Sequence, residues 1–245
     1  GRMRAPLTRV VIPAYRATRT IRDCVCAVLS STTSADCEIV VVDDGENGDL
    51  AAFLADLPVA IVPSFSGSAA AARNRGAENC TAPLLVFLDA DVMIEPCCLE
   101  HLLAPLLYGD ADATVGNYSR DVAGLSFGGR YKQLYIACMN GRRRPYLHTF
   151  WTAIGAVEAR AFAAVGGFDT AFKGANGEDA EFGARLAARG FRILPVPDAR
   201  GQHRHSLSLR QLVANDWRKG VFALRHYRQS DGALSDNCHA TRRDK

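Results

Sequence analysis

Short apolar stretches alternate along the chain with longer segments in which apolar residues recur every three or four positions. The short stretches are rich in β-branched residues and end in turn or acidic residues, which is typical of buried strands. They cover residues 9–13, 38–44, 59–62 and 84–91. The segments between them, at 17–31, 49–57 and 68–80, have the spacing of amphipathic helices. This alternation predicts an α/β fold with a mostly parallel central sheet flanked by helices.

Polar and turn residues gather where the predicted strands end. They are Pro13, Ala14 and Tyr15 after the first strand, Asp43, Asp44 and Gly45 after the second, and Asp89, Ala90 and Asp91 after the fourth. Each group alone is compatible with an ordinary turn. Ligands of parallel α/β sheets bind beyond the carboxyl ends of the strands, so three such groups at one edge favour a ligand site.

Asp89 and Asp91 alternate around Ala90. If the strand geometry continues to residue 91, both carboxylates point to one side and repel each other. A divalent cation such as Mn²⁺ or Mg²⁺, bridging to a diphosphate, would relieve this repulsion, because these ions favour carboxylate and phosphate oxygens. We therefore predict a metal and diphosphate site here, with a plain surface turn as the alternative.

The composition is that of a globular protein. Of 245 residues, 48% are hydrophobic and 22% are charged, which excludes wholesale disorder, collagen-like repetition and a coiled coil. The formal net charge of +3 is too small to indicate a nucleic-acid partner. No stretch approaches about 18 uncharged apolar residues, and the first residues lack the apolar region of a signal peptide. We therefore expect no transmembrane segment and a cytoplasmic location.

Eight cysteines are many for a chain of this length. A domain of this size needs no covalent cross-links, so buried free thiols are the favoured interpretation over disulfides. The Cys24-x-Cys26 pair and the adjacent Cys97 and Cys98 lack a second pair at zinc-finger spacing. The cysteines therefore do not predict a metal site.

Several motifs, taken in their order and spacing, resemble those of glycosyltransferase family 2. They are VIPAY at 11–15, VVVDDG at 40–45, AARNRGAE at 71–78, FLDADV at 87–92, GGFD at 166–169, GEDAEFGARLAARGFR at 177–192 and HRHSLSLRQL at 203–212. The resemblance covers about residues 8–225, with no assignable motif from about 118 to 150. Each motif alone is weakly specific, but the combination is highly specific.

The resemblance implies a GT-A fold, a nucleotide-sugar donor, a divalent metal and inversion at the anomeric carbon. It implies one domain in two halves, with the donor half at 1–117, the acceptor-binding and catalytic half at 118–229, and a polar tail at 230–245. The residues it places near the donor are Pro13, Ala14, Tyr15, Asp43 or Asp44, Arg73, Asp89 and Ala90. Asp91 of the DXD motif would bind the Mn²⁺ or Mg²⁺, with His203, slightly favoured, or His205 as a second contact.

The resemblance also implies that Asp179 is the catalytic base, with Glu178 beside it. Sugar transfer needs such a group, because inversion requires one carboxylate to accept the proton of the acceptor hydroxyl. The pattern places Asp179 in the first turn of a helix with Asn176 as N-cap, where the helix dipole favours the ionised form. The alternative is that these acids only occupy a helix N-terminus.

Acceptor specificity is expected in the irregular stretch from about 119 to 148. The arginines at 142–144 suit an anionic acceptor, although short charge runs also occur in loops without a ligand. Trp151 is a candidate platform for an acceptor sugar, and core packing explains it equally well. A helix predicted from Ser206 has a basic face that is compatible with peripheral membrane contact, although a solvated outer face is favoured.

The sequence therefore predicts a metal-dependent inverting glycosyltransferase that uses a nucleotide sugar, with a UDP-sugar as first choice. Its acceptor would be a carbohydrate or lipid-linked hydroxyl, in the synthesis of a polysaccharide, glycolipid or cell-envelope glycan. A sugar nucleotidyltransferase is the first alternative, but the chain lacks an early glycine-rich phosphate loop. A non-catalytic module that binds nucleotide sugars is the second, although the presence of Asp91 and Asp179 counts against it.

Overall fold

The computed structural model describes residues 7–33, 37–45, 49–141, 146–172, 177–204, 208, 210–214 and 217. Strands and helices alternate through most of this part of the chain, as the apolar pattern predicts. The strands are β1 (Thr8–Ala14), β2 (Cys37–Asp43), β3 (Ala60–Pro63), β4 (Leu84–Leu88), β5 (Val92–Ile94), β6 (Ala113–Tyr118), β7 (Ile154–Glu158) and β8 (Ile193–His203). The helices are α1 (Ile21–Leu29), α2 (Leu50–Phe53), α3 (Ala69–Ala77), α4 (Cys98–Leu107), α5 (Phe127–Asn140), α6 (Ala159–Val165) and α7 (Glu178–Ala188).

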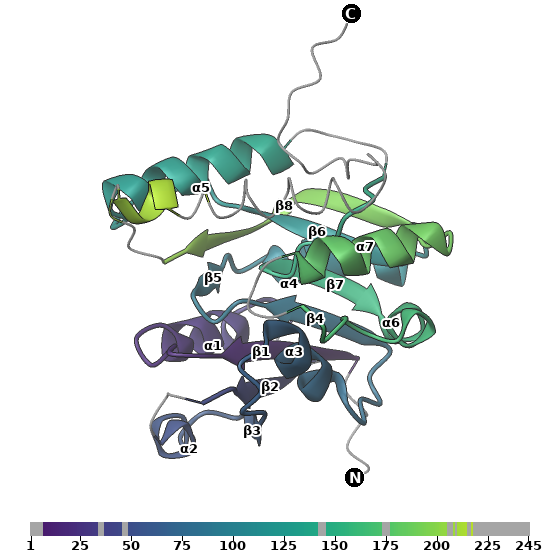
Figure 1. Ribbon diagram of the computed structural model, residues 1–245, viewed down its shortest axis with the longest axis horizontal. Helices are drawn as coiled ribbons and strands as arrows, with labels where there is room; N and C mark the ends of the chain where they lie inside the picture. Colours follow the sequence, from purple (N-terminus) through teal and green to yellow (C-terminus); the bar gives the residue numbers. More distant parts are fainter. Residues whose placement is uncertain are drawn as a thin grey trace, which may run out of the picture.

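The strands form one sheet of eight, in the order β3-β2-β1-β4-β7-β6-β8-β5, which rises from β3 to β8 in Figure 1. The strands β3, β2, β1 and β4 are parallel, whereas β7 runs antiparallel to both β4 and β6. The chain leaves β1 toward β2 and β3 and then returns to the other side of β1 as β4. Such a reversal is where α/β sheets bind ligands. The predicted α/β fold in a single domain is confirmed, with a curled mixed sheet.

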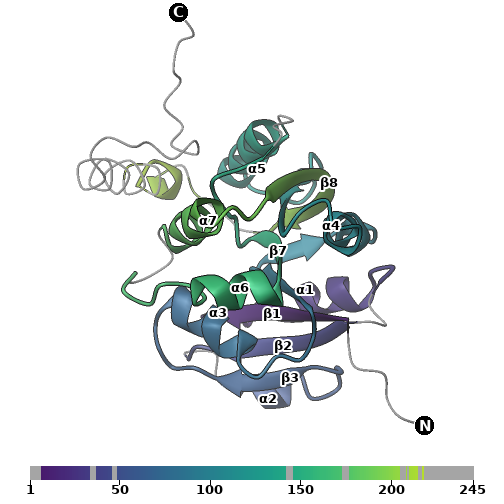
Figure 2. The same ribbon diagram turned by 90° about the vertical axis from the view of Figure 1, so that its right-hand side faces the viewer.

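Helices cover both faces of the sheet, and each face has its own apolar core. Residues of α1, α2, α4 and α5 pack into one core, and residues of α3, α6 and α7 pack into the other. Figure 2 shows α3, α6 and α7 on one side of the sheet and α1 and α4 on the other. Full burial of a side chain such as Phe87 or Phe182 contributes about 1.5–3 kcal/mol each to stability.

Two glycines allow helices to approach the chain beneath them. A Cβ on Gly76 of α3 would lie 2.3 Å from Cγ1 of Val11 in β1. A Cβ on Gly183 of α7 would lie 2.1 Å from the backbone nitrogen of Phe150. Real carbon atoms do not come this close, so glycine at these positions sets how closely α3 and α7 can lie against the sheet and its adjoining chain.

Some predicted element boundaries differ from the observed ones. The N-cap of α7 is Gly177, whose φ of +86° lies in the left-handed region that favours glycine. The predicted cap, Asn176, lies outside the described residues. The helical turn at 210–214 follows Ser208, whose Oγ accepts a hydrogen bond from the backbone N–H of Gln211 at 3.3 Å.

Other predictions fall on parts of the chain that the structure does not describe. These are the cap at Ser206, the arginines at 142–144, the polar tail at 230–245 and the basic positions beyond residue 217. The boundary between the predicted halves, at 117 and 118, falls inside β6. The division into halves therefore stays a prediction.

The prediction of buried thiols is correct for only some of the cysteines. Cys24 and Cys98 are buried, whereas Cys26, Cys97 and Cys138 are exposed. The buried positions of α1 recur at helical spacing, and Cys26 follows Cys24 by only two residues, so it faces away from the core. The apolar character of the surrounding sequence does not settle which side of a helix a cysteine occupies.

Candidate active site

The carboxyl ends of β1, β2 and β3 lie side by side because these strands are in register. Ala14 pairs with Asp43, and Asp43 pairs with Pro63. This register brings together the residues predicted from the first two strand ends, which are Pro13, Ala14, Tyr15, Asp43 and Asp44. Ala14 is buried within the sheet, whereas the side chain of Tyr15 is exposed at the edge.

The neighbours Asp43 and Asp44 make different contacts. Asp43 is the more exposed of the two, and its Oδ1 accepts a hydrogen bond from the N–H of Gly45 at 3.1 Å. Asp44 is buried, and its Oδ1 accepts from the N–H groups of Ser66 at 2.7 Å and Gly67 at 3.2 Å. Asp44 therefore anchors the loop between β3 and α3, and Asp43 is the better placed of the two to meet a ligand.

The two aspartates of the DXD motif diverge, so the prediction that both point to one side is wrong. β4 ends at Leu88, and the N–H of Val92 donates to the carbonyl of Asp89 at 3.0 Å in a turn. The alternation of a strand therefore does not extend to Asp91. Asp89 instead turns toward α3 and Asp91 toward β8, with Ala90 buried between them.

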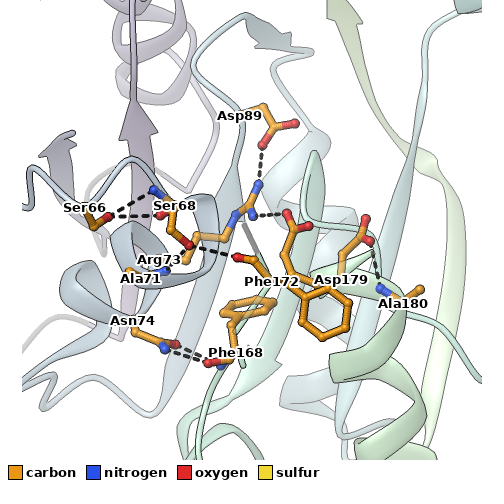
Figure 3. A network of polar contacts seen from close by, with 11 residues as sticks. Ser66, Ser68, Ala71, Arg73, Asn74, Asp89, Phe168, Phe172, Asp179 and Ala180 are labelled. Carbon is orange, nitrogen blue, oxygen red and sulfur yellow. Dashed lines mark hydrogen bonds and ion pairs between the residues drawn. The ribbon is translucent and has the colours of Figure 1, made fainter. Parts of the chain in front are cut away.

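Arg73 of α3 connects this turn to α7, as Figure 3 shows. Its guanidinium donates from Nη1 to Oε1 of Glu178 at 2.7 Å and from Nη2 to Oδ1 of Asp89 at 3.0 Å. The side chains of Arg73 and Glu178 are each only 4% exposed. Burial alone would lower the pKa of Arg73, but the carboxylates of Asp89 and Glu178 outweigh it and raise the pKa above its usual value.

Asp179 lies beside this ion pair in the first turn of α7 (Figure 3). It is half-buried, and its Oδ1 accepts a hydrogen bond from the N–H of Ala180 at 2.8 Å. Burial raises the pKa of Asp179 to about 6, and the carboxylate of Glu178 acts in the same direction. A general base works best when its pKa is close to the working pH, so Asp179 has the properties of one.

His203 is held from several sides at the end of β8. It pairs with Val92 of β5, which brings its Nε2 to 3.1 Å from Oδ2 of Asp91. The ring of Tyr118 stacks on its imidazole with 5.3 Å between ring centroids. Its backbone N–H donates to Oε1 of Gln133 at 3.1 Å. His205, the other candidate metal contact, lies outside the described residues.

Asp91 and His203 together offer a carboxylate oxygen and an imidazole nitrogen to a cation. Within the described ranges, no group of three His, Cys, Asp or Glu side chains is arranged to hold a metal. Mg²⁺ and Mn²⁺ commonly combine one or two protein ligands with phosphate oxygens and water. The pair therefore fits a cation that is bound together with a diphosphate.

Trp151 packs edge-on against Tyr118, with 4.7 Å between ring centroids. It is half-buried and contacts both apolar cores. These contacts give the core-packing interpretation a structural basis, and the role of Trp151 toward an acceptor stays a prediction. Tyr118 connects Trp151 to His203 by ring contacts on both sides.

Sequence reasoning missed three residues that support the site, namely Asn74, Tyr118 and Gln133. Tyr118 and Gln133 lie in a stretch without a recognisable motif, so no local signal marks them. Asn74 does lie in a motif, and its amide donates to the carbonyl of Phe168 at 2.8 Å and accepts from the N–H of Phe168 at 2.9 Å. The joint presence of the AARN and GGFD motifs was the available signal for this contact.

The sheet has a central strand, β4, that is followed by the turn of Asp89 and Asp91, and this turn lies close to the helix that begins with Glu178 and Asp179. The model of glycosyl transferase family 2 matches residues 9–162, and that of the N-terminal domain of galactosyltransferase matches residues 132–207. The chain belongs to glycosyl transferase family 2.

Two of the curated relatives are bacterial glycosyltransferases of different names. The chain is 32% identical over 191 residues to pre-mycofactocin glycosyltransferase of Mycobacterium tuberculosis, covering 72% of this chain and 39% of that protein. It is 30% identical over 228 residues to validoxylamine A glucosyltransferase of Streptomyces hygroscopicus, covering 76% of this chain and 52% of that protein. The chain thus spans 39% and 52% of the lengths of these relatives.

Solved structures share the fold at low sequence identity. A mannosyltransferase from Pyrobaculum calidifontis in complex with GDP-Man and Mn²⁺ superposes with a TM-score of 0.71 at 17% identity, covering 93% of this chain and 65% of that one. S. aureus TarS 1-349 in complex with UDP-GlcNAc superposes with a TM-score of 0.65 at 16% identity, covering 84% of this chain and 60% of that one.

Among the described residues, no helix has the length and apolarity needed to span a membrane.

Proposed function

We propose that this protein transfers a sugar from a nucleotide-sugar donor to an acceptor hydroxyl, with a divalent metal and with inversion at the anomeric carbon. The observation that carries the proposal is the position of Asp179, a carboxyl group with a pKa of about 6, beside the Arg73 contact to the DXD turn. Family membership supports it, as do the donors GDP-Man and UDP-GlcNAc of the structural neighbours.

The donor would lie along the strand ends from β2 to β8. Tyr15 and Asp43, which lie at neighbouring strand ends, would contact the base and ribose, and Asp89 would lie near the ribose. Asp91 and His203 would hold Mn²⁺ or Mg²⁺, which when bound neutralises the negative charge of the leaving diphosphate. Arg73 was expected near the nucleotide or its diphosphate. Because it is paired with the carboxylates of Asp89 and Glu178, we propose that it positions these two side chains.

Asp179 would act as the base of a single displacement. The acceptor oxygen forms a bond to the anomeric carbon as the bond from that carbon to the diphosphate oxygen breaks, and the hydroxyl proton passes to the Asp179 carboxylate. Attack from the side opposite the leaving group inverts the configuration. Glu178 is buried against Arg73 and does not reach the substrate in this scheme; its charge raises the proton affinity of Asp179.

Isothermal titration with UDP and GDP, each with and without Mn²⁺, tests the proposal. We expect metal-dependent binding, with UDP as the preferred nucleotide and a UDP-sugar as the first donor to assay. Failure of every nucleoside diphosphate to bind in the presence of Mn²⁺ would refute the proposal. Release of pyrophosphate from a sugar phosphate and a nucleoside triphosphate would instead identify a nucleotidyltransferase, and donor binding without hydrolysis or transfer would identify a binding module.

The acceptor is proposed to be a hydroxyl of a carbohydrate or of a lipid-linked glycan. We further propose that residues 1–117 bind the donor and residues 118–229 bind the acceptor and supply the base. One relative of this sequence is named for pre-mycofactocin and another for validoxylamine A. The names of the relatives therefore do not point to one acceptor. Acceptor choice is therefore best tested after the nucleotide has been identified.

A further inference from the structure

Phe65, in the loop between β3 and α3, has a conformation that is unusual for phenylalanine. Its backbone φ is +51°, in the left-handed region, and its side chain is 72% exposed. Few residues other than glycine adopt this backbone conformation. A ring that stays in water contributes little hydrophobic stabilisation to offset its cost. Local strain of this kind persists where the surrounding structure enforces it, and it is concentrated at functional sites.

The surrounding loop does enforce it. On one side of Phe65, the N–H of Ser64 donates to the carbonyl of Asp43 at 2.8 Å. On the other side, Oδ1 of Asp44 accepts from the N–H of Ser66 at 2.7 Å, from Oγ of Ser66 at 2.9 Å and from the N–H of Gly67 at 3.2 Å. Bonds to a charged oxygen are stronger than neutral ones, so a buried carboxylate fixes the backbone that presents this ring.

The ring of Phe65 lies over the end of β2. Its Cδ1 is 3.5 Å from the position that a Cβ on Gly45 would occupy, so no side chain separates the ring from the backbone there. β2 lies between β1 and β3, and Tyr15, 50% exposed, follows β1. Tyr15 and Phe65 therefore flank the end of β2 from the two neighbouring strands.

The spacing of these two residues suits a planar ligand. Strands in a sheet are about 4.8 Å apart, so positions that follow β1 and β3 are about 10 Å apart. Stacked ring pairs have centroids about 4.5–7 Å apart, so a separation of about 10 Å leaves room for one flat ring between the two side chains. Asp43, whose side chain is half-buried, ends β2 between these two strands.

We propose that Phe65 stacks on one face of the donor nucleobase, opposite Tyr15, and that Asp44 is a positioning residue that holds the Phe65 loop. The identity of the ligand as a nucleotide rests on the proposed function. A base is the occupant that fits, because the position lies on the far side of β1 from β4, whose end carries the DXD turn for the diphosphate. A ring face does not distinguish bases, so UDP and GDP should both use this contact.

Substitution of Phe65 by asparagine tests the proposal in the full chain. Asparagine tolerates a positive φ and lacks an aromatic face. In Phe65→Asn we expect the Kd for UDP and for GDP, measured by titration calorimetry with Mn²⁺, to rise about 5- to 100-fold. We expect its thermal midpoint to equal or exceed that of the unchanged protein. Phe65→Tyr should retain the affinity, and Tyr108→Ala, which removes an 81% exposed ring after α4, should leave it unchanged.

Three results would overturn the proposal. The first is a Kd for both nucleotides in Phe65→Asn that stays within twofold of the unchanged protein. The second is loss of affinity in Phe65→Tyr equal to that in Phe65→Asn, since the ring is then not the recognised feature. The third is a thermal midpoint of Phe65→Asn that is lowered so far that partial unfolding explains its loss of affinity. An unchanged protein that binds no nucleotide at all would instead refute the proposed function.

The role of Asp44 has its own readout. If Asp44 acts only by holding the loop, Asp44→Ala should weaken nucleotide binding in the unchanged background and add nothing in the Phe65→Asn background. A further loss of similar size in the double variant would show that Asp44 contacts the nucleotide itself and would remove its positioning role. Circular dichroism of each variant checks that the fold is retained.

Discussion

The proposed donor end of the site, where β1, β2 and β3 end, and its proposed catalytic end, where α7 begins, are held in place by different means. At the donor end, Ala14, Asp43 and Pro63 are neighbours through strand register, so the backbone itself aligns the residues that follow them. At the catalytic end, Glu178 begins a helix and is tied to Arg73, 105 positions earlier, by a side-chain contact. Single side-chain substitutions at the donor end should therefore leave the alignment of the strand ends intact, whereas the catalytic end depends on a few contacts between distant parts of the chain.

The largest expected effect separates the two ends. Asp179→Asn removes the proposed base and should lower kcat by about 10²- to 10⁴-fold, since general base catalysis contributes this much. Nucleotide affinity should stay within about twofold, because no donor-end contact changes. The two values are measured by steady-state assay and titration calorimetry. Retained turnover would remove Asp179 from the role of base.

The same variant predicts a specific dependence of stability on pH. The carboxyl of Asp179 has an ordinary pKa of 3.8 and a pKa of about 6 in the folded protein. Below about pH 3 both states are protonated, so the pKa shift no longer contributes to the difference in thermal midpoint between the asparagine variant and the unchanged protein. Above pH 6 the folded protein must hold a half-buried charge beside Glu178, so Asp179→Asn should be more stable than the unchanged protein. The kcat of the unchanged protein should fall as pH drops through about 6, because the base becomes protonated.

Removal of Arg73 breaks the link between the two ends. Arg73→Met leaves Glu178 as an uncompensated buried carboxylate, which should destabilise the fold by about 3–5 kcal/mol in urea unfolding. The matched control is Arg75→Met, also in α3, which removes an exposed ion pair to Glu78 and an exposed hydrogen bond to the carbonyl of Pro63 and should cost less than about 1 kcal/mol. Adding Glu178→Gln to Arg73→Met should restore part of the stability, and no restoration would contradict the ion-pair explanation.

The same contrast explains what could be predicted from the sequence. Parallel strands end at one edge, so VIPAY and VVVDDG predicted their shared location correctly from local pattern alone. The divergence of Asp89 and Asp91 could not be predicted, because it depends on β4 ending one residue before the motif. The contact between Arg73 and Glu178 has no local signal either, since it joins elements far apart in the chain.

A smaller effect concerns the metal pair, which lies between the two ends. His203→Ala should weaken Mn²⁺-dependent binding of UDP by about 10- to 100-fold, comparable to the loss of a supporting group at other metal sites. Binding without metal should not change. Titrations with and without EDTA measure both values. Equal losses in the two conditions would show that His203 acts on the fold of β8 and not on a cation.

Asn74→Ala should give the smallest effect on stability and activity. It also tests most directly whether the donor end and the catalytic end are held independently. Its two hydrogen bonds to Phe168 fasten the loop before α7 to the donor-side helix α3, as Ser68 does through the carbonyl of Phe172 at 3.2 Å. Their loss should cost about 1–2 kcal/mol of stability in urea unfolding. Because this loop leads into the helix that carries Asp179, kcat should fall while the Kd for UDP stays unchanged. Equal losses in kcat and nucleotide affinity would show that the two ends of the site are not held independently.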